Sequence, residues 1–515
     1  YKVLERDNME MKNILEKVWE RERKELGFLP LKNPRIEKRE GFTAYIDLRN
    51  KEIVIGKKFI EDLFNAGMNY EDIFKGICRH EGGHYRFHPY DVYTILLELY
   101  ALKQYDEGKF GGKKAEDIRL FFDDVVDNMY QIVNSRDHGL DRLYKGMPPI
   151  YKQSRVMKLL CAYYSEMSGL DFGVSIQDLD NDLKNRLEKL KKIDFLDRNN
   201  LTLNIRGFAR LIVDLLDDKY IYTCEGIGLN LFDEEEMEKG LRKIAKEVSP
   251  KDFEEIYKYV KVRCKHGEDE NISIKANVEY YKTLAIQYPI KILGIPLSNT
   301  VSYPEQMKEW EIGNELKKIN IYRSFGKIFP GITKQWVDSS YKTYGDKKKI
   351  PDSIIVLDSS GSMINPKGSV SQALVAAFSI ALAYLLNNAK VDVINFSNGA
   401  TVKPYKSAQS VFETLVIYKG RGTEPPYKEL EELVKDNNKD VTVITDGFEG
   451  ASNEDIERFM KVLSKIGKKN RVSFVYIAVN KDEYEQLKKY DNILFHYVER
   501  NDDIASIILG DVKWI

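Results

Sequence analysis

Cysteine, net charge and long apolar runs are all scarce in this sequence. Its 515 residues include four cysteines, which are far apart and form no CxxC pair. We therefore expect neither a disulfide framework nor a cysteine-rich zinc site, and this cysteine usage favours a reducing cytoplasm. The formal net charge is −1, so no overall electric field favours nucleic acid as a partner.

Three kinds of segment are also missing. The first residues, YKVLERDNMEMK, carry charges where a signal peptide needs an apolar core. The longest apolar stretch, around residues 373–386, is too short to cross a bilayer and predicts a buried helix. The sequence contains no G-K-[ST] and hence no P-loop for ATP. We expect a cytoplasmic protein without a membrane partner and without ATPase activity of its own.

The length predicts two or three domains, and the residue pattern changes three times along the chain. The first segment combines helical periodicity with two β-like runs, the second is mostly helical, the third is a connection rich in proline and turn formers, and the fourth alternates strands with helices. These segments are 1–145, 146–287, 288–350 and 351–515. The predicted fold has several domains. Its amino-terminal region is mostly helical and belongs to the α+β class.

Residues 351–515 predict an α/β domain. Apolar strands such as SIIVLD, VDVINFS and KDVTVITD alternate with helical segments. Such alternation is typical of a doubly wound, mostly parallel sheet, which binds its ligands at the carboxyl ends of its strands. The residues that follow these strands are therefore the candidates for a binding site.

Carboxylates and hydroxyls follow several of these strands. The sequence DSSGSM ends the first strand and contains Asp358, Ser360 and Ser362. Downstream, GRGTEP contains Thr423 and ITDG contains Asp446. A site built only from such oxygen ligands suits a hard cation such as Mg²⁺, with Mn²⁺ or Ca²⁺ as alternatives.

This oxygen set resembles the metal-ion-dependent adhesion site of von Willebrand factor A domains, and the match covers 351–515. The resemblance implies a Rossmann-like fold in which Ser360, Ser362 and Thr423 ligate the ion directly or nearly so. Asp358 and Asp446 would act partly through water, leaving one coordination position for an Asp or Glu of a protein partner. Intracellular domains of this type often serve MoxR-type AAA+ ATPases, so the resemblance also implies a separate ATPase as partner.

Three of the six histidines fall within CRHEGGHYRFH, residues 78–88. On a helix, His80 and His84 project from one face and can bind one Zn²⁺, with Glu81 as the general base that deprotonates the metal-bound water. A predicted hairpin over residues 43–56 precedes this helix and could bind an extended substrate at its edge. His88 follows the helix, where we expect the helix dipole to stabilise it.

The two glycines within this motif are unusual for a helix interior. Together, Gly82 and Gly83 cost about 2 kcal/mol relative to alanines. The metal interpretation accounts for them if another segment or a substrate approaches closely. We expect Asp124 to lie against Gly82.

A catalytic zinc site needs a third protein ligand, and a predicted helix over residues 115–134 supplies candidates. Its sequence FFDDVVDNMY places acids next to apolar residues, an unusual position in the absence of a cation. The motif of His80, Glu81 and His84 resembles the H-E-x-x-H motif of zincin metallopeptidases of the gluzincin type. These enzymes take their third ligand from an acid on a later helix, and this acid is more often Glu. That resemblance favours Asp124 as the third ligand, with Asn128 as a polar residue that contacts the ligands and not the metal. Asp123 and Asp127 remain alternatives.

The chain thus resembles a zincin-like metallopeptidase fused to a von Willebrand factor A domain, as in prokaryotic proteins associated with MoxR. The resemblance implies a zinc-dependent hydrolase whose A domain binds a partner or substrate through Mg²⁺. The alternative is a non-catalytic, chaperone-like adaptor in which the zinc is structural and the A domain mediates complex assembly.

Overall fold

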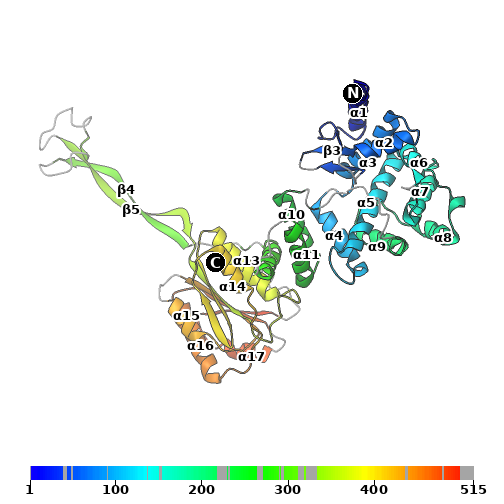
Figure 1. Cartoon of the computed structure of the whole chain (residues 1–515). Coiled ribbons are helices and arrows are strands. Elements are labelled where there is room, and N and C mark those ends of the chain that lie inside the picture. Colours follow the sequence, from blue (N-terminus) through cyan, green and yellow to red (C-terminus); the bar gives the residue numbers. More distant parts are fainter. Residues whose placement is uncertain are drawn as a thin grey trace. The chain divides into compact units, whose positions relative to one another are not determined.

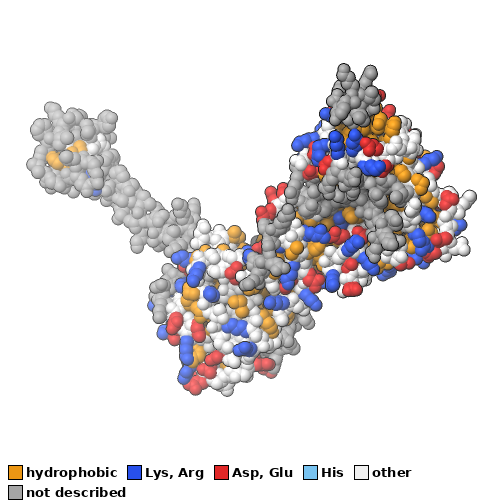
Figure 2. All heavy atoms as spheres, in the orientation of Figure 1, with side chains coloured by type: hydrophobic (Ala, Val, Ile, Leu, Met, Phe, Trp, Pro, Cys, Tyr) orange, Lys and Arg blue, Asp and Glu red, His pale blue; other side chains and the backbone are white. Residues whose placement is uncertain are grey.

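The computed structural model divides the chain into two compact units, residues 1–280 and 281–515. The predicted helical extension belongs to the first unit up to Tyr280 and is not separate from residues 1–145. Lys and Arg side chains are interspersed with Asp and Glu over the visible, described face of each unit (Figure 2). The structure describes residues 2–38, 43–47, 50–89, 91–135, 137, 139–149, 153–216, 229, 232–263, 271–288, 290, 295–310, 318–320, 333–434, 439–477 and 481–498.

The first unit is mainly helical with one small sheet (Figure 1). Its strands and longer helices are α1 (Lys2–Glu25), β1 (Arg35–Glu37), β2 (Ala44–Asp47), β3 (Glu52–Gly56), α2 (Lys57–Asn65), α3 (Tyr70–Arg86), α4 (Val92–Leu102), α5 (Lys113–Asn134), α6 (Leu140–Gly146), α7 (Arg155–Ser168), α8 (Asn181–Leu190), α9 (Leu201–Ile212), α10 (Glu234–Ile244), α11 (Pro250–Arg263) and α12 (Ile272–Ala285). The last of these crosses the boundary between the units.

The predicted hairpin is confirmed. Strands β2 and β3 pair antiparallel, and the sheet has the order β1-β3-β2. β2 is therefore an edge strand of this sheet. Its Ala44 and Ile46 side chains are buried, while Tyr45 and Asp47, which alternate with them, are less buried, as the two-residue repeat of a strand requires. Strand β2 also contacts α3, which carries the histidine motif.

Helix α3 forms despite its two internal glycines. Asn69 caps its start by accepting a hydrogen bond from the Asp72 amide at 2.9 Å, and every residue from Ile73 to His84 is buried. Burial against several neighbours supplies the stability that the glycines do not, because tertiary packing outweighs intrinsic helix propensity.

The glycines admit two different neighbours, and the expectation that Asp124 lies against Gly82 was wrong. A Cβ at Gly82 would come within 2.5 Å of Leu26 Cδ1, just after α1. A Cβ at Gly83 would lie 3.1 Å from Gln131 Nε2 and 3.4 Å from Asp127 Cγ, both on α5. Gly83 is thus the glycine that lets the acidic helix approach the histidine helix.

The second unit contains a six-stranded, mixed sheet with the order β11-β10-β9-β6-β7-β8 (Figure 1). All neighbouring pairs are parallel except β7 with the edge strand β8. Its elements are β6 (Asp352–Asp358), α13 (Gln372–Leu386), β7 (Val391–Ser397), β8 (Gly399–Lys403), α14 (Ala408–Leu415), α15 (Tyr427–Leu433), β9 (Lys439–Thr445), α16 (Asn453–Gly467), β10 (Val472–Ile477), α17 (Lys481–Leu487) and β11 (Leu494–Val498).

The strand order reverses direction between β6 and β9. From β6 the chain adds β7 and β8 on one side, and then it adds β9, β10 and β11 on the other. Alternate strand residues such as Ile354 and Val443 pack with α15, α16 and α17 in one apolar core, and α13 contacts β6 as well. Ligands of such sheets bind at the carboxyl ends of the strands where the order reverses. Asp358 ends β6 and Asp446 follows β9, so both residues flank this point.

The predicted connection over residues 288–350 contains two long strands that the sequence did not indicate. Strands β4 (Ile295–Glu309) and β5 (Lys334–Lys349) pair antiparallel as a long two-stranded ribbon (Figure 1). The register shifts next to Pro296 and Pro304, as expected where proline cannot donate to the ladder. These prolines made the strands resemble turns in the sequence. Among the described residues, no helix combines the length and apolar character of a membrane span.

Candidate metal centres

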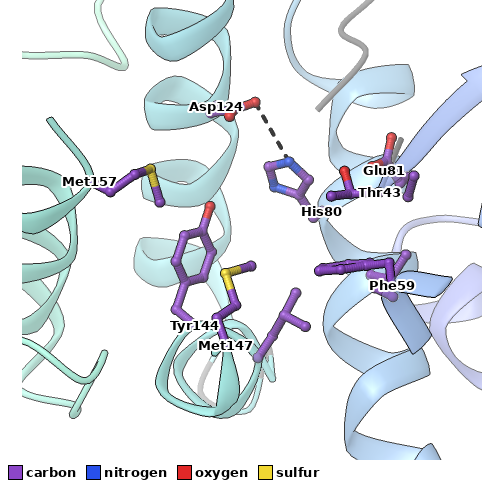
Figure 3. A pocket seen from close by; sticks show the side chains of 11 residues that line it. Thr43, Phe59, His80, Glu81, Asp124, Tyr144, Met147 and Met157 are labelled. Atoms are coloured by element: carbon purple, nitrogen blue, oxygen red, sulfur yellow. Dashed lines mark ion pairs between the residues drawn. The ribbon is translucent and has the colours of Figure 1, made fainter. Parts of the chain in front are cut away.

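Two helices bring the predicted zinc ligands together. His80 and His84 lie on α3, and Figure 3 shows Asp124, on α5, facing His80. Asp124 Oδ1 lies 3.1 Å from His84 Nε2 and 3.5 Å from His80 Nε2. One ligand atom from each of the three residues lies within 4.8 Å of the others. Glu81 lines the same cavity as His80 and Asp124.

The other nitrogen of each imidazole faces a hydrogen-bond acceptor. His80 Nδ1 lies 3.0 Å from the Asn128 side-chain oxygen. His84 Nδ1 lies 3.1 Å from the backbone carbonyl of His88 and also contacts the Asp127 carboxylate. An acceptor at Nδ1 keeps the proton on that nitrogen, so both Nε2 atoms present lone pairs toward Asp124.

This donor set fits zinc. Two imidazole nitrogens and a carboxylate oxygen are three ligands typical of a catalytic zinc site, with the fourth position open to water. Bonds of about 2.0–2.1 Å in a tetrahedron place neighbouring ligand atoms about 3.4 Å apart. The separations of 3.1 and 3.5 Å from Asp124 to the two histidines match that spacing. Without a cation or an additional proton, three lone-pair atoms so arranged would repel one another.

Asn128 is held in place by two tyrosines from other helices. Its amide nitrogen donates to the hydroxyls of Tyr144, on α6, and Tyr164, on α7, at 2.9 and 3.1 Å. These donations fix the amide so that its oxygen points to His80. Burial raises the pKa of Tyr164 well above its ordinary value, so its hydroxyl stays protonated. The orientation of His80 thus depends on three helices besides its own.

Asp123 and Asp127, the two alternatives to Asp124 as third ligand, have different neighbours. Asp127 contacts His84 Nδ1, on the side of the ring away from Asp124, and burial raises its pKa. Asp123 faces away from the His80–His84 pair and lies 3.3 Å from His88. The structure therefore groups Asp124, and neither Asp123 nor Asp127, with the Nε2 atoms of His80 and His84.

His88 belongs to a buried charge cluster that the sequence interpretation missed. Its Nε2 lies 2.5 Å from Glu98 Oε1 on α4 and 3.3 Å from Asp123 Oδ1, and Arg119 Nη1 lies 2.6 Å from Asp123 Oδ2. Burial alone would lower the pKa of His88, but the two carboxylates outweigh it and raise the pKa. The expected dipole-stabilised histidine at the helix end was wrong, since α3 ends at Arg86 and His88 is buried beyond it.

His88, Glu98 and Asp123 could also hold a metal ion, but the charges of this cluster balance without one when Arg119 is included. A protonated His88 and Arg119 match the two carboxylates of Glu98 and Asp123, whereas a divalent ion would leave excess positive charge in a buried place. We interpret this cluster as an ion-pair network. A sequence signal existed in Glu98, the one acid within the apolar helix sequence VYTILLELYAL.

We expect Glu98→Gln to lower the free energy of unfolding by about 3–5 kcal/mol, because it removes one partner of a buried ion pair. Urea denaturation measures this change. Glu20→Gln is the control, since Glu20 pairs with Lys24 at the surface, and such pairs contribute under about 1 kcal/mol. An equally small effect for both variants would contradict a buried, charged network at His88.

In the second unit, four of the five predicted oxygen ligands are linked by hydrogen bonds. The Ser360 amide donates to Asp358 Oδ1 at 2.8 Å, and the Ser360 and Ser362 hydroxyls are 3.0 Å apart. Ser362 donates to Asp446 Oδ1 at 2.8 Å. The hydroxyl of Thr445, which the sequence analysis did not single out, donates to Asp358 Oδ2 at 2.6 Å. This set connects the carboxyl ends of β6 and β9.

The loop that carries Thr423 lies beside this turn. The Gly361 amide donates to the Arg421 carbonyl at 2.8 Å, and the Gly420 amide donates to the Ser359 carbonyl at 2.9 Å. Thr423 itself is buried. The backbone therefore brings all three predicted segments to one end of the sheet, although none of the hydrogen bonds described above involves the Thr423 side chain.

The sequence matches no protein-family model, and it matches no curated protein at a significant level. The two candidate centres differ in their donor atoms. One combines imidazole nitrogens with a carboxylate and suits zinc, and the other offers only oxygens and suits a hard divalent cation.

The oxygen site leads to a pH-dependent prediction. Burial, with a smaller contribution from Asp446, raises the pKa of Asp358 to about 6, against hydrogen bonds from Thr445 and Ser360 that lower it. Because the folded pKa exceeds the unfolded one, ionising Asp358 without a cation costs stability as the pH rises from about 4 to about 6. A cation needs the ionised carboxylate. We expect millimolar Mg²⁺ to raise the melting temperature of the second unit above about pH 6 and progressively less below it.

Calorimetry of the full chain at about pH 5 and about pH 8, with and without Mg²⁺, measures this effect. Asp358→Ala should abolish the Mg²⁺-dependent shift. Asp491→Ala, at an exposed position of the same unit, should retain it. A shift of equal size at both pH values would contradict a role for Asp358 in binding the cation.

Proposed function

We propose that this protein is a zinc-dependent peptidase whose second unit binds a protein partner through a magnesium ion. The observation that carries the proposal is the position of Asp124 Oδ1, which lies 3.1 Å from His84 Nε2 and 3.5 Å from His80 Nε2, separations typical of zinc ligands. Glu81, adjacent to His80 and in the same cavity, is the carboxylate for general base catalysis.

In this mechanism the chain's residues position the substrate and move one proton. When bound, zinc supplies Lewis acidity to the scissile carbonyl and lowers the pKa of a water molecule. Glu81 accepts the proton of the attacking water and later delivers it to the leaving amine. Among the described residues, β2 stands at the end of the sheet order, the position at which extended peptides commonly add to sheets in peptide recognition. Asp127, Asn128 and the His88 carbonyl hold the imidazoles in one tautomer.

We further propose that the second unit has the architecture of a von Willebrand factor A domain and recruits a partner carrying an Asp or Glu. Its support is the cluster of Asp358, Ser360, Ser362 and Asp446 at the point where the strand order reverses. The partner class that we favour is a MoxR-type AAA+ ATPase, since the chain has no P-loop of its own.

The proposed activity is tested by metal analysis and peptide cleavage on the purified full chain. We expect one zinc per chain, cleavage of a mixture of unstructured peptides, and loss of both after treatment with dipicolinic acid. Readdition of zinc should restore cleavage. A protein that carries no zinc after zinc supplementation would contradict the proposal.

A second function is favoured by one observation, the burial of the centre. His84 and Glu81 expose only 1% and 2% of their surface, as in a closed, structural metal site. The protein would then be a chaperone-like adaptor whose second unit mediates assembly. The two functions are distinguished by the activity of two variants, each measured in the presence of the intact partner complex. Asp358→Ala would abolish function in both cases, whereas Glu81→Gln would abolish it only in the peptidase.

A further inference from the structure

The last turn of α12 belongs to the second unit. The boundary between the units falls between Tyr280 and Tyr281, so this one helix carries neighbouring residues of different units. Ser379, on α13, donates its hydroxyl to the Ala285 carbonyl at 3.3 Å. The rings of Tyr281 and Phe378, the latter also on α13, have their centroids 5.9 Å apart. The turn is therefore packed against α13, although the chain reaches it well before β6.

The hydroxyl of Tyr281 bridges two points of one loop. It donates to the Pro366 carbonyl at 2.9 Å and accepts a hydrogen bond from the Ser371 amide at 3.1 Å. The Ser369 carbonyl lies 3.3 Å away. Tyr281 is fully buried, and a buried hydroxyl needs such partners because it has given up its hydrogen bonds to water. One side chain from outside the loop thus holds the backbone of residues 366–371.

This loop begins at the oxygen ligands of the proposed cation site. Residues 359–371 connect the end of β6 to α13, and Ser362, a candidate ligand, stands shortly before Pro366. At the other end, the Ser371 side chain caps the start of α13. Ser362, Ser371 and Asp446 line one small cavity. The part of the loop that Tyr281 holds is therefore close to two of the cation ligands.

A fixed loop favours cation binding. A loop that is already ordered binds an ion more tightly than one that must become ordered on binding, because ordering costs conformational entropy. Without the Tyr281 hydroxyl, the Pro366 carbonyl and the Ser371 amide would lose a shared buried partner, and the loop between them would be less restrained. The affinity for the cation would then fall although every ligand is still present.

We infer that Tyr281 is a positioning residue for the cation site, and that packing of the last turn of α12 raises the affinity of the second unit for Mg²⁺. The inference rests on the proposed Mg²⁺-dependent binding by the second unit and adds its regulation. By thermodynamic reciprocity, Mg²⁺ must stabilise the last turn of α12 to the same extent. Any event that displaces this turn would weaken cation binding and, with it, the capture of an acidic side chain.

Magnesium titration calorimetry on the full chain tests the role of the hydroxyl. Tyr281→Phe keeps the ring and removes only the hydroxyl, and we expect it to weaken Mg²⁺ binding at least about fivefold. Tyr280→Phe is the matched control, since the adjacent Tyr280 is also buried and its hydroxyl donates to the Val248 carbonyl at 3.0 Å within the first unit. It should leave the Mg²⁺ affinity unchanged. Asp358→Ala defines the binding that does not involve the oxygen site.

The outcomes separate this inference from the proposal on which it rests. Equal Mg²⁺ affinities of the unchanged chain and Tyr281→Phe would overturn the inference alone, and so would an equal loss in both tyrosine variants. Failure of the unchanged chain to bind Mg²⁺ above the level of Asp358→Ala would overturn both the inference and Mg²⁺-dependent partner binding.

Hydrogen exchange measures the reciprocal effect, which a merely structural role of Tyr281 would not produce. The Ile286 and Gln287 amides donate to the Lys282 and Leu284 carbonyls and so report on the last turn of α12. We expect saturating Mg²⁺ to slow their exchange at least about threefold in the unchanged chain and to have no effect in Asp358→Ala. Exchange in α11 should stay the same. An exchange rate at Ile286 and Gln287 that does not respond to Mg²⁺ would overturn the inference.

Discussion

Replacement of Glu81 by glutamine is expected to leave one zinc per chain and to lower kcat/KM for peptide cleavage by about 10²–10⁴-fold. The glutamine has nearly the same shape but cannot accept a proton from the attacking water. The metal is retained because the ligating atoms belong to His80, His84 and Asp124. Metal analysis and initial cleavage rates on the same preparation separate the two effects.

The matched control for this experiment is Glu71→Gln in the first turn of the same helix. Glu71 is exposed and pairs with Arg21 at the surface, so its replacement should change neither zinc content nor cleavage. Full cleavage by the Glu81→Gln protein would exclude the proposed proton transfer and leave the structural-zinc adaptor as the better interpretation. Loss of zinc in that variant would instead place Glu81 among the ligands.

The second large effect concerns Asp124. We expect Asp124→Ala to weaken zinc binding at least about 100-fold, because it removes one of three protein ligands. Asp127→Asn should weaken it by only about 10–100-fold, the range typical of groups that orient a ligating histidine. The order of these effects follows from the geometry, since Asp124 faces Nε2 of both histidines while Asp127 contacts Nδ1 of His84.

Competition with a chromogenic zinc chelator measures both affinities, and circular dichroism checks that each variant is folded. Asp117→Asn, farther toward the start of the same helix, serves as the control and should leave the affinity unchanged. A greater loss for Asp127→Asn than for Asp124→Ala would exchange the roles of the two acids.

The helix that carries the histidines was predictable because its signals are local. The spacing of His80 and His84, the adjacent Glu81 and the upstream hairpin are all set by residues close in sequence, and they agree with the helix and hairpin that form. The strands at the switch point of the second unit were predictable for the same reason, since each is a short apolar run followed by a turn.

The rotation of the acidic helix was not predictable from periodicity. Asp123, Asp124 and Asp127 lie close together on α5, and a turn of the helix about its axis by one residue would exchange which of them faces the histidines. Packing against Gly83 sets that rotation, and Gly83 contacts α5 through Asp127 and Gln131. The ion pair between His88 and Glu98 was missed because it joins residues whose pairing depends on how α4 packs.

The contacts around His80 have a consequence for the synthesis of the protein. The ribosome makes His80 and Glu81 long before Asp124, and Asp124 before Tyr164, whose hydroxyl holds the Asn128 amide against His80. A nascent chain that ends before α7 therefore has both histidines but cannot hold them in the orientation described here. In the proposed zinc site, the orientation of His80 described here would therefore be available only after α7 has emerged and packed. A zinc ion that reached the nascent chain earlier would encounter two imidazoles that are not yet held in this orientation, and it would bind without the selectivity of the completed site.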